Sequence, residues 1–528
     1  MRFRFITLSL HLAALLAFAV LPSCDKDPLN NGTTSSGETG SGGNNGGNNG
    51  GNSGGNSGGN SGENDGGNSG SGDNTGDNTG GITGGNGGSG NDGGYTAEEG
   101  LAYVFDGNCI PEIHISVTPD QWNALLNAYD ADSNTATYIS CNVLYDKAGE
   151  QTRINDCGLR LKGNTSRRRP EGNTGQMHEA GNTDWHHCHF QLNFTKNFKD
   201  TAHELHGVKK LYFKWFKDDP AYVRELYCYD LFRRYGIWTA PHSAYCRLWI
   251  KVEGDPKEAY YGVYDMIELI DGRYANAREQ QFVNKDGFVW KCSYGATLNS
   301  TDSGLFGNDG SDKTYELKTQ TANYAAAEAQ LKDFILKLTG KGEESFYTWI
   351  KQVCDVELLL KTYAVNVAVG MWDDYWNNKN NFYLYFNSQD QFSYKFFFIP
   401  YDYDNTLGTS SNCGNQSDSG RQDPFNWGDN GNLLIYRLLK FEDFRKIYND
   451  ALLELCSSSK DLFCYSASTA RIRAWQDSIR PYVQNDTGED MSIEDRPASW
   501  GNHGEYRILD PNNNFFLVKT QTINQYCK

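Results

Sequence analysis

The chain has 528 residues, a formal net charge of -18 at pH 7 and an aromatic content of 13%. The acidic balance argues against a nucleic-acid partner, because such a partner needs a basic face on the protein. The aromatic residues gather after residue 94, which excludes disorder for that part and leaves enough length for one large domain or two lobes.

The first residues have the pattern of a bacterial secretion signal. Arg2 and Arg4 form a short basic region, residues 5–21 are nearly all apolar, and LPSC ends at Cys24. The apolar run is too short to span a membrane. The ending resembles a lipobox, so we expect residues 1–23 to be a lipoprotein signal peptide and Cys24 to be the lipidated first residue of the mature chain. A plain signal peptide is the alternative. The expected location is the cell envelope, at the outer membrane or cell surface, with the lipid as the membrane anchor.

Residues 24–94 are expected to form a disordered tether. From residue 31 onwards they are almost only Gly, Asn, Ser, Thr and Asp, with the repeat GGNSGGNSGGNSG. Such a composition cannot bury enough apolar surface to offset the entropy lost on ordering. The tether would hold the remaining domain, residues 95–528, away from a membrane.

The chain has 13 cysteines, and assigning Cys24 to the lipid leaves an even number. In an exported chain some of them can form disulfides. No two are spaced as C-x-x-C, which argues against a zinc ribbon or a thioredoxin-like redox site.

The first part of the domain is predicted to be rich in strands. A helix should begin near Val117, because Thr118 can cap it, Pro119 suits its first turn and Gln121 has the spacing of a capping box. Apolar and alternating patterns predict strands at 158–162, 189–194, 210–215, 245–250, 260–268 and 287–291.

A helix over 218–236 should interrupt these strands, with Asp219 as its cap, Pro220 in its first turn and Gly236 as its end. The second half of the domain is predicted to be mainly helical, with helices at 323–338, 355–370, 432–457 and 466–480 and a hairpin formed by 380–386 and 394–400. The sequence therefore predicts an α+β protein with a strand-rich N-terminal lobe and a mainly helical, hairpin-bearing C-terminal lobe.

Acidic and amide side chains gather around the predicted hairpin. Asn381 and Asp402 should lie at the same end of it, because the outgoing strand starts where the returning strand finishes. Their oxygen atoms would suit Mg²⁺ or Mn²⁺. Asp373 or Asp374, which precede the hairpin, could orient or deprotonate a hydroxyl nucleophile, as phosphoryl transfer requires. Asp404 is either a further metal ligand or part of a turn in DNTLG.

Six ordered blocks of the sequence together resemble the spore-coat protein H (CotH) kinase family. They are LRLKGNTS (159–166), LHGVKKLYFKWFKDDPAYVRELYCYDLFRRYGI (205–237), YYGVYDMIELID (260–271), GFVWK (287–291), WDDYWNNKNNFYLY (372–385) and FFFIPYDYDNTLG (396–408). The resemblance covers about residues 110–410 and leaves 411–528 as a helical extension.

The resemblance implies a bilobal, atypical protein-kinase-like fold that transfers the ATP γ-phosphoryl group to Ser or Thr of an exported protein. It implies that Asp373, preferred over Asp374, is catalytic, that Asn381 and Asp402 hold the metal, and that Glu268 lies near the nucleotide. Arg160 or Lys162 would contact phosphates. Lys214, with Arg224 and Glu225, forms an ion-pair network around the nucleotide or else only decorates a helix.

The chain departs from the family pattern at HHCHFQLNF. Many relatives carry a basic residue here, where this chain has His186, His187 and His189. The resemblance therefore does not say which residue supplies the cation that binds phosphate. The histidines could themselves hold a metal, but on a strand they alternate between faces, which favours a structural role. SRRRPEG (166–172) is either a solvated loop or a phosphate-facing one.

The motifs of ordinary protein kinases are absent from the sequence, which excludes that class. The sequence leaves two further hypotheses about function. One is a non-catalytic surface lipoprotein, an adhesin or glycan-binding protein that uses exposed aromatic rings. The other is a pseudokinase that binds nucleotide without turnover.

Overall fold

A computed structural model describes residues 95–164, 166–199, 203–409, 418–497 and 506–528. The predicted signal peptide, the lipidation site Cys24 and the tether lie outside these residues. Among the described helices, none combines the length and apolar character needed to cross a membrane.

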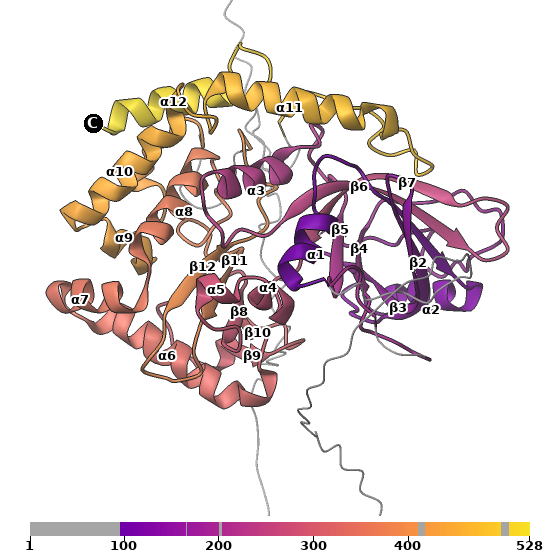
Figure 1. Cartoon of the computed structure of the whole chain (residues 1–528), viewed down its shortest axis with the longest axis horizontal. Coiled ribbons are helices and arrows are strands. Elements are labelled where there is room, and N and C mark those ends of the chain that lie inside the picture. Colours follow the sequence, from indigo (N-terminus) through magenta and orange to yellow (C-terminus); the bar gives the residue numbers. More distant parts are fainter. Residues whose placement is uncertain (1–94, 165, 200–202, 410–417, 498–505) are drawn as a thin grey trace, which may run out of the picture. The chain divides into compact units, whose positions relative to one another are not determined.

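The N-terminal part of the described chain is a closed barrel with the strand order β1-β2-β3-β4-β5-β7-β6 (Figure 1). Neighbouring strands are antiparallel except β1 and β6, which run parallel. The strands are β1 (Glu112–Val117), β2 (Ile139–Lys147), β3 (Glu150–Lys162), β4 (His189–Asn193), β5 (Lys210–Lys214), β6 (Ser243–Val252) and β7 (Ala259–Glu268). The strands predicted between residues 158 and 268 are therefore confirmed, and β1 and β2 are additional.

Apolar side chains from alternate positions of these strands fill the barrel. In β5, for example, Leu211 and Phe213 belong to the barrel core, whereas Tyr212 packs in the separate core of the helical region. Helices α1 (Ala97–Val104) and α2 (Pro119–Ala131) add to the barrel core. Thr118 caps α2 as predicted, but the side chain of Gln121 accepts a hydrogen bond from the Ser140 backbone at 2.7 Å, so the capping box is not formed.

The second sheet has five strands in the order β12-β11-β8-β10-β9. They are β8 (Phe288–Cys292), β9 (Phe306–Asn308), β10 (Tyr315–Leu317), β11 (Phe382–Phe386) and β12 (Phe396–Pro400). The predicted hairpin is confirmed as β11 and β12, which pair Phe382 with Pro400 and Phe386 with Phe396. The difference from the prediction is that the hairpin is not isolated, because β8 pairs with β11 and thus belongs to this sheet instead of the barrel.

Helices pack around this sheet (Figure 1), and all except the two between β7 and β8 contribute to the largest apolar core of the described chain, whereas those two belong to a smaller core on the other face of the sheet. They are α3 (Arg224–Arg234), α4 (Gly272–Asn276), α5 (Glu279–Phe282), α6 (Tyr324–Gly340), α7 (Glu343–Val353), α8 (Val356–Ala368), α9 (Leu433–Leu438), α10 (Glu442–Cys456), α11 (Tyr465–Ile479) and α12 (Phe515–Tyr526). The mixture of helices and strands confirms the α+β class. The helix predicted over 432–457 is divided into α9 and α10.

Helix α3 starts later than the sequence predicts. The carboxylate of Asp219 accepts hydrogen bonds from the backbone N–H groups of Val223 at 3.0 Å and Arg224 at 2.8 Å. Asp219 thus satisfies the first turn of a helix that begins at Arg224, and Pro220 lies in the preceding loop. Gly236 ends the helix in the left-handed conformation, with φ +84°, as predicted.

Candidate active site

Lys214, at the end of β5, contacts three carboxylates from two other segments. Because Leu211 and Phe213 point into the barrel, Lys214 points to the opposite face of the strand. Its Nζ atom lies 2.5 Å from Glu225 Oε2, 2.5 Å from Asp402 Oδ1 and 3.1 Å from Asp404 Oδ2. The predicted ion pair of Lys214 with Glu225 is therefore present, whereas its place around a nucleotide stays a prediction.

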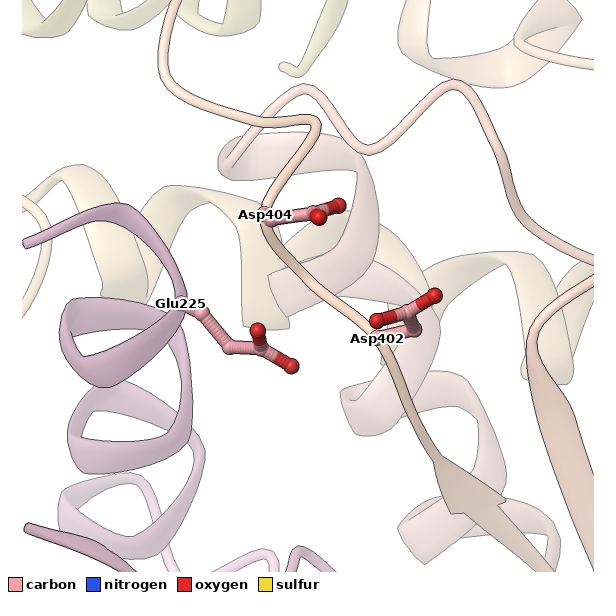
Figure 2. A group of neighbouring side chains, drawn as sticks. All are labelled: Glu225, Asp402 and Asp404. Carbon is pink, nitrogen blue, oxygen red and sulfur yellow. The ribbon is translucent and has the colours of Figure 1, made fainter. Parts of the chain in front are cut away.

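The loop after β12 brings Asp402 and Asp404 to this position (Figure 2). Asp402 has a left-handed backbone with φ +64°, which is uncommon for a residue other than glycine. Its backbone N–H donates to the hydroxyl of Tyr229 at 2.9 Å, and the N–H of Tyr403 donates to Glu225 Oε1 at 3.2 Å. These bonds tie the loop to α3 and hold the unusual turn.

The carboxylates outnumber the cation that contacts them. Burial, together with the charge of Asp402, raises the pKa of Glu225 to about 7. Burial and the neighbouring carboxylates raise the pKa of Asp404 to about 8. Burial also opposes ionisation of Asp402, but the Lys214 ammonium outweighs it and lowers the pKa of Asp402. The excess negative charge in this group suits a further cation.

The donor set fits a divalent metal ion. One oxygen atom from each of Glu225, Asp402 and Asp404 lies within 4.8 Å of the others. Oxygen donors of this kind suit Mg²⁺ or Mn²⁺. Asp402 and Asp404 are about a third exposed, at 35% and 30%, whereas Glu225 is 5% exposed. Glu225 also has both oxygens hydrogen-bonded, to Lys214 and to Tyr229, so it is better placed to hold Lys214 than to bind an ion.

Asp373 follows α8 and is enclosed by asparagine amides. Its Oδ1 accepts from Asn378 at 2.6 Å and from Asn380 at 3.1 Å, and its Oδ2 accepts from Asn381 at 2.9 Å. Burial, with a contribution from the charge of Asp402, raises its pKa to about 6. The hydrogen bonds found for the Asp373 carboxylate among the described residues come from these three amides, and none comes from the Lys214 group.

Asp374 has a different environment. Its Oδ2 accepts from Asn366 at 2.6 Å and its Oδ1 from the backbone of Asn377 at 2.7 Å. Burial raises its pKa to about 7. Both oxygens are used within the turn itself, which gives Asp374 a structural role in the turn and leaves Asp373 as the better catalytic candidate.

Asn381 and Asp402 lie at the same end of the hairpin, as predicted, since Phe382 pairs with Pro400. Within the described chain, however, no hydrogen bond joins the two side chains, and the amide nitrogen of Asn381 donates to Asp373. The structure thus groups Asp402 with Asp404 and Glu225, and groups Asn381 with Asp373.

Two lysines that have no carboxylate partner in the described part of the chain flank the same loop. Lys162 of β3 lies 3.8 Å from the ring centroid of Tyr212 and 3.5 Å from the hydroxyl of Tyr401. Lys291 of β8 pairs in register with Tyr383, whose ring lies 5.1 Å from that of Tyr401. Among the described residues neither lysine makes an ion pair.

Burial and neighbouring cations make these two lysines harder to protonate. The pKa of Lys162 lies well below its usual range because of burial and then the charges of Arg160 and Lys291. The pKa of Lys291 is lowered by burial and by Lys318. Arg160 itself donates to Gln191 at 3.0 Å. An anionic group bound here would supply the counter-charge that these side chains lack.

Glu268 does not belong to the Lys214 group, and its place near the nucleotide stays a prediction. In the pairing of β5 with β7, Leu211 is opposite Glu268 and Lys214 is opposite Asp265. Glu268 therefore shares the face of Leu211, and the acidic residue of β7 on the face of Lys214 is Asp265. Glu268 instead accepts from Arg278 at 2.7 and 2.8 Å.

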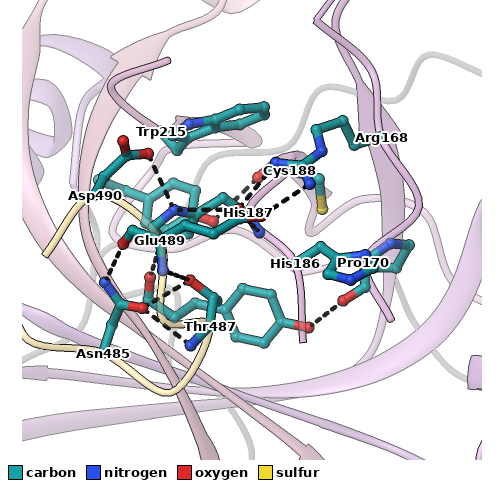
Figure 3. Close-up of polar contacts among 12 residues, drawn as sticks. Arg168, Pro170, His186, His187, Cys188, Trp215, Asn485, Thr487, Glu489 and Asp490 are labelled. Carbon is teal, nitrogen blue, oxygen red and sulfur yellow. Dashed lines mark hydrogen bonds and ion pairs between the residues drawn. The ribbon is translucent and has the colours of Figure 1, made fainter. Parts of the chain in front are cut away.

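The histidine motif has structural partners (Figure 3). His187 bonds the carbonyl of Tyr261 at 2.7 Å, and its backbone donates to Glu489 at 3.1 Å. His189 accepts from the backbone of Trp215 at 3.1 Å. Their hydrogen-bond partners differ, which agrees with the structural reading.

The basic motif is likewise structural. Arg168 forms two hydrogen bonds with Glu489, both at 2.9 Å, and thereby fastens a segment beyond α11 to the barrel (Figure 3). Arg169 pairs with Asp130 at 2.9 Å. Arg224, the third member of the predicted network, pairs with Asp219 and does not contact the Lys214 group.

Sequence reasoning missed Lys291 and Asp265 as neighbours of this site. A signal existed for both, because each is a charged residue between apolar neighbours within a predicted strand, in FVWKC and in VYDMI. A charge in such a place needs a partner or a ligand. The sequence could not show which face of the strand each would occupy.

The sequence model of the CotH kinase protein family matches residues 159–510, more than half of the chain. The chain belongs to the CotH kinase family. No curated protein matches it. The match runs past residue 410, so helices α9 to α11 belong to the family region and not to an extension.

Proposed function

We propose that this CotH family member is an atypical protein kinase that transfers the γ-phosphoryl group of ATP to Ser or Thr of an exported protein. The observation that carries the proposal is the contact of Lys214 with Glu225 and Asp402. It joins the barrel, α3 and the loop after β12 at one point. Phosphoryl transfer depends on such positioned charges far more than on covalent chemistry.

In this proposal the barrel and the helical region act as the two lobes of a kinase-like fold. Asp402 and Asp404 would hold Mg²⁺ or Mn²⁺, which when bound neutralises charge on the phosphates. Lys214 would bind phosphate while Glu225 positions its ammonium group. Lys162 and Lys291, which have no carboxylate partner among the described residues, would take up their positive charge when the phosphates supply the counter-charge.

Asp373 would orient the acceptor hydroxyl and accept its proton. The support is its raised pKa, of about 6, which lies nearer to the working range of a general base than that of an ordinary aspartate. The three asparagine amides hold its carboxylate in one orientation. Asn381, which the sequence assigned to the metal, would act here through Asp373.

The test uses the full chain and its Asp402→Asn variant. We expect the wild type to bind ATP only with Mg²⁺ or Mn²⁺ and to phosphorylate itself or an added protein on Ser or Thr. The variant should lose metal-dependent binding and at least about 100-fold in turnover. Absence of nucleotide binding with either metal would support a surface-binding lipoprotein, and binding without turnover would support a pseudokinase.

We also propose that the chain is exported and anchored by a lipid on Cys24, so that the acceptor is another exported protein. The support is the basic, apolar and LPSC pattern at residues 1–24. Labelling with a radioactive fatty acid should mark the wild type and not the Cys24→Ala variant. Equal labelling of the two would contradict the assignment.

A further inference from the structure

The barrel core contains two cysteines that face each other on neighbouring strands. Cys141 of β2 and Cys157 of β3 are opposite each other in the strand register, and their sulfur atoms lie 3.7 Å apart. Both side chains are buried, with exposures of 3% and 0%. Opposed residues on antiparallel strands have Cα separations within the range that a disulfide can span.

A bulge beside the pair fixes the register of these strands. Between the pairs Cys141–Cys157 and Val143–Ile154, β3 contains one residue more than β2. Asp156 has φ +55°, and its N–H donates to the side chain of Asn142 at 3.1 Å. A slip in register would have to move this bulge, so the two thiols stay opposite each other.

We propose that Cys141 and Cys157 form a disulfide between β2 and β3 when the chain folds in an oxidising compartment. This inference depends on the proposed export and not on kinase activity. Each thiol loses its hydrogen and one S–S bond forms. The two electrons and two protons pass to the disulfide of a thiol–disulfide oxidoreductase, whose S–S bond breaks into two thiols.

The bond would form before the barrel closes. Burial raises the pKa of the Cys141 thiol well above its usual range, which disfavours the reactive thiolate in the folded protein. The same burial would then shield the disulfide from reductants. Because β3 continues to Arg160 and Lys162, the bond would also fix the strand that presents these cations.

The direct test is a peptide map of the full chain. The protein is isolated from the envelope of cells that export it, unfolded without reductant in the presence of an alkylating reagent, and digested. We expect one linked peptide that contains Cys141 and Cys157, and none in protein kept reduced. Complete alkylation of both cysteines in the exported protein, or a link to another cysteine, would overturn the proposal.

Matched variants separate this pair from other buried thiols. The Cys188→Ala and Cys246→Ala variants change cysteines of the same core and should keep the linked peptide. Reductant should lower the midpoint of thermal unfolding of the exported wild type by several degrees more than that of the double variant Cys141→Ala with Cys157→Ala. An equal shift in both would contradict the proposal. If the double variant does not fold, the peptide map of the wild type decides alone.

Discussion

Two buried ion clusters of this protein balance their charges in opposite ways. At Glu268 one carboxylate meets the two guanidinium nitrogens of Arg278, at 2.7 and 2.8 Å, and the ring of His242 at 2.8 Å. At Lys214 one ammonium meets three carboxylates. In the first cluster the Glu268 carboxylate has two side-chain partners, Arg278 and His242. In the second cluster three carboxylates share one ammonium group.

The pKa directions record this difference. Arg278 and His242 keep the pKa of Glu268 well below its usual range even though burial opposes ionisation. Burial and like charges instead raise the pKa of Glu225 to about 7 and that of Asp404 to about 8. In a balanced cluster each charge has its partner within the fold, so removing one partner destabilises the protein, whereas an unbalanced cluster is one that a ligand can complete.

Replacing Lys214 by Met should have the largest effect, because it removes the cation shared by three carboxylates. We expect turnover to fall at least about 100-fold. Without metal the free energy of unfolding should fall by about 3 kcal/mol. Added Mg²⁺ should restore part of that loss, because it can neutralise the remaining carboxylates.

The measurements are phosphoryl transfer and thermal unfolding with and without Mg²⁺. Lys217→Met is the matched control, since Lys217 lies on the same segment and pairs with Asp218 away from this cluster. A Lys214 variant that loses stability, is not restored by Mg²⁺ and keeps wild-type turnover when folded would show that the cluster is only structural.

Asn substitutions at Asp373 and Asp374 test whether the first residue is catalytic and the second structural. Asp373→Asn should keep metal-dependent ATP binding and lose about 100-fold in turnover, because the base is gone. Asp374→Asn should lower the free energy of unfolding by about 1 to 2 kcal/mol, because one acceptor in its turn is lost. Equilibrium ATP binding, single-turnover kinetics and denaturant unfolding distinguish the two. Equal effects on turnover and stability would mean that they act as one structural unit.

Replacing Glu268 by Gln tests the balanced cluster by changing how the free energy of unfolding depends on pH. A carboxyl whose pKa is lowered on folding stabilises the protein above its ordinary pKa, near 4.5, and loses this contribution as the pH falls toward the lowered value. We expect the variant to be about 3 kcal/mol less stable at pH 7, because Arg278 keeps its charge without a partner. The difference should shrink steadily below pH 4.5.

The readout is the free energy of unfolding as a function of pH, with ATP affinity measured beside it. ATP affinity of the folded variant should match the wild type. A weaker affinity without a change in stability would instead support the place near the nucleotide that the family resemblance implies for Glu268.

Much of the site could be predicted because it is formed by residues that are close together in the sequence. The strand FFFIP and the Asn-rich turn before FYLYF predict a hairpin, and hairpin pairing alone brings Asn381 and Asp402 to one end. The contact of Lys214 with Asp402 could not be read in this way, since it joins residues that are 188 positions apart. That contact depends on how the barrel packs against the second sheet.

In the barrel, the sequence likewise could not predict which face of a strand a given residue occupies. Glu268 and Asp265 are three residues apart and therefore point to opposite sides of β7, but the sequence does not say which side faces Lys214. The same applies to β8, where the residue pattern predicts a strand but not the sheet to which it belongs. The pairing of β8 with β11 decides that Lys291 lies near Tyr383.

Lys519 of α12 is a third buried charged residue. In the described chain this cation has no carboxylate partner. Its Nζ donates to the carbonyl of Ser419 at 2.9 Å and lies 4.2 Å from the centroid of the Trp427 ring. Burial lowers its pKa to about 7 from the ordinary 10.5. In contrast to the Lys214 group, it does not belong to a cluster of carboxylates among the described residues, so we expect this charge to cost stability.

Replacing Lys519 by Met should therefore raise the free energy of unfolding by about 1 kcal/mol at pH 7. Between pH 7 and 10.5 the unfolded wild type binds more protons at this lysine than the folded one, so wild-type stability should rise with pH over that range. The advantage of the variant should shrink accordingly in unfolding measurements at increasing pH. Lys446→Met, at a lysine that is 72% exposed, should change stability little and serves as the control. A destabilised Lys519 variant would show that its hydrogen bond to Ser419 outweighs the cost of burying the charge.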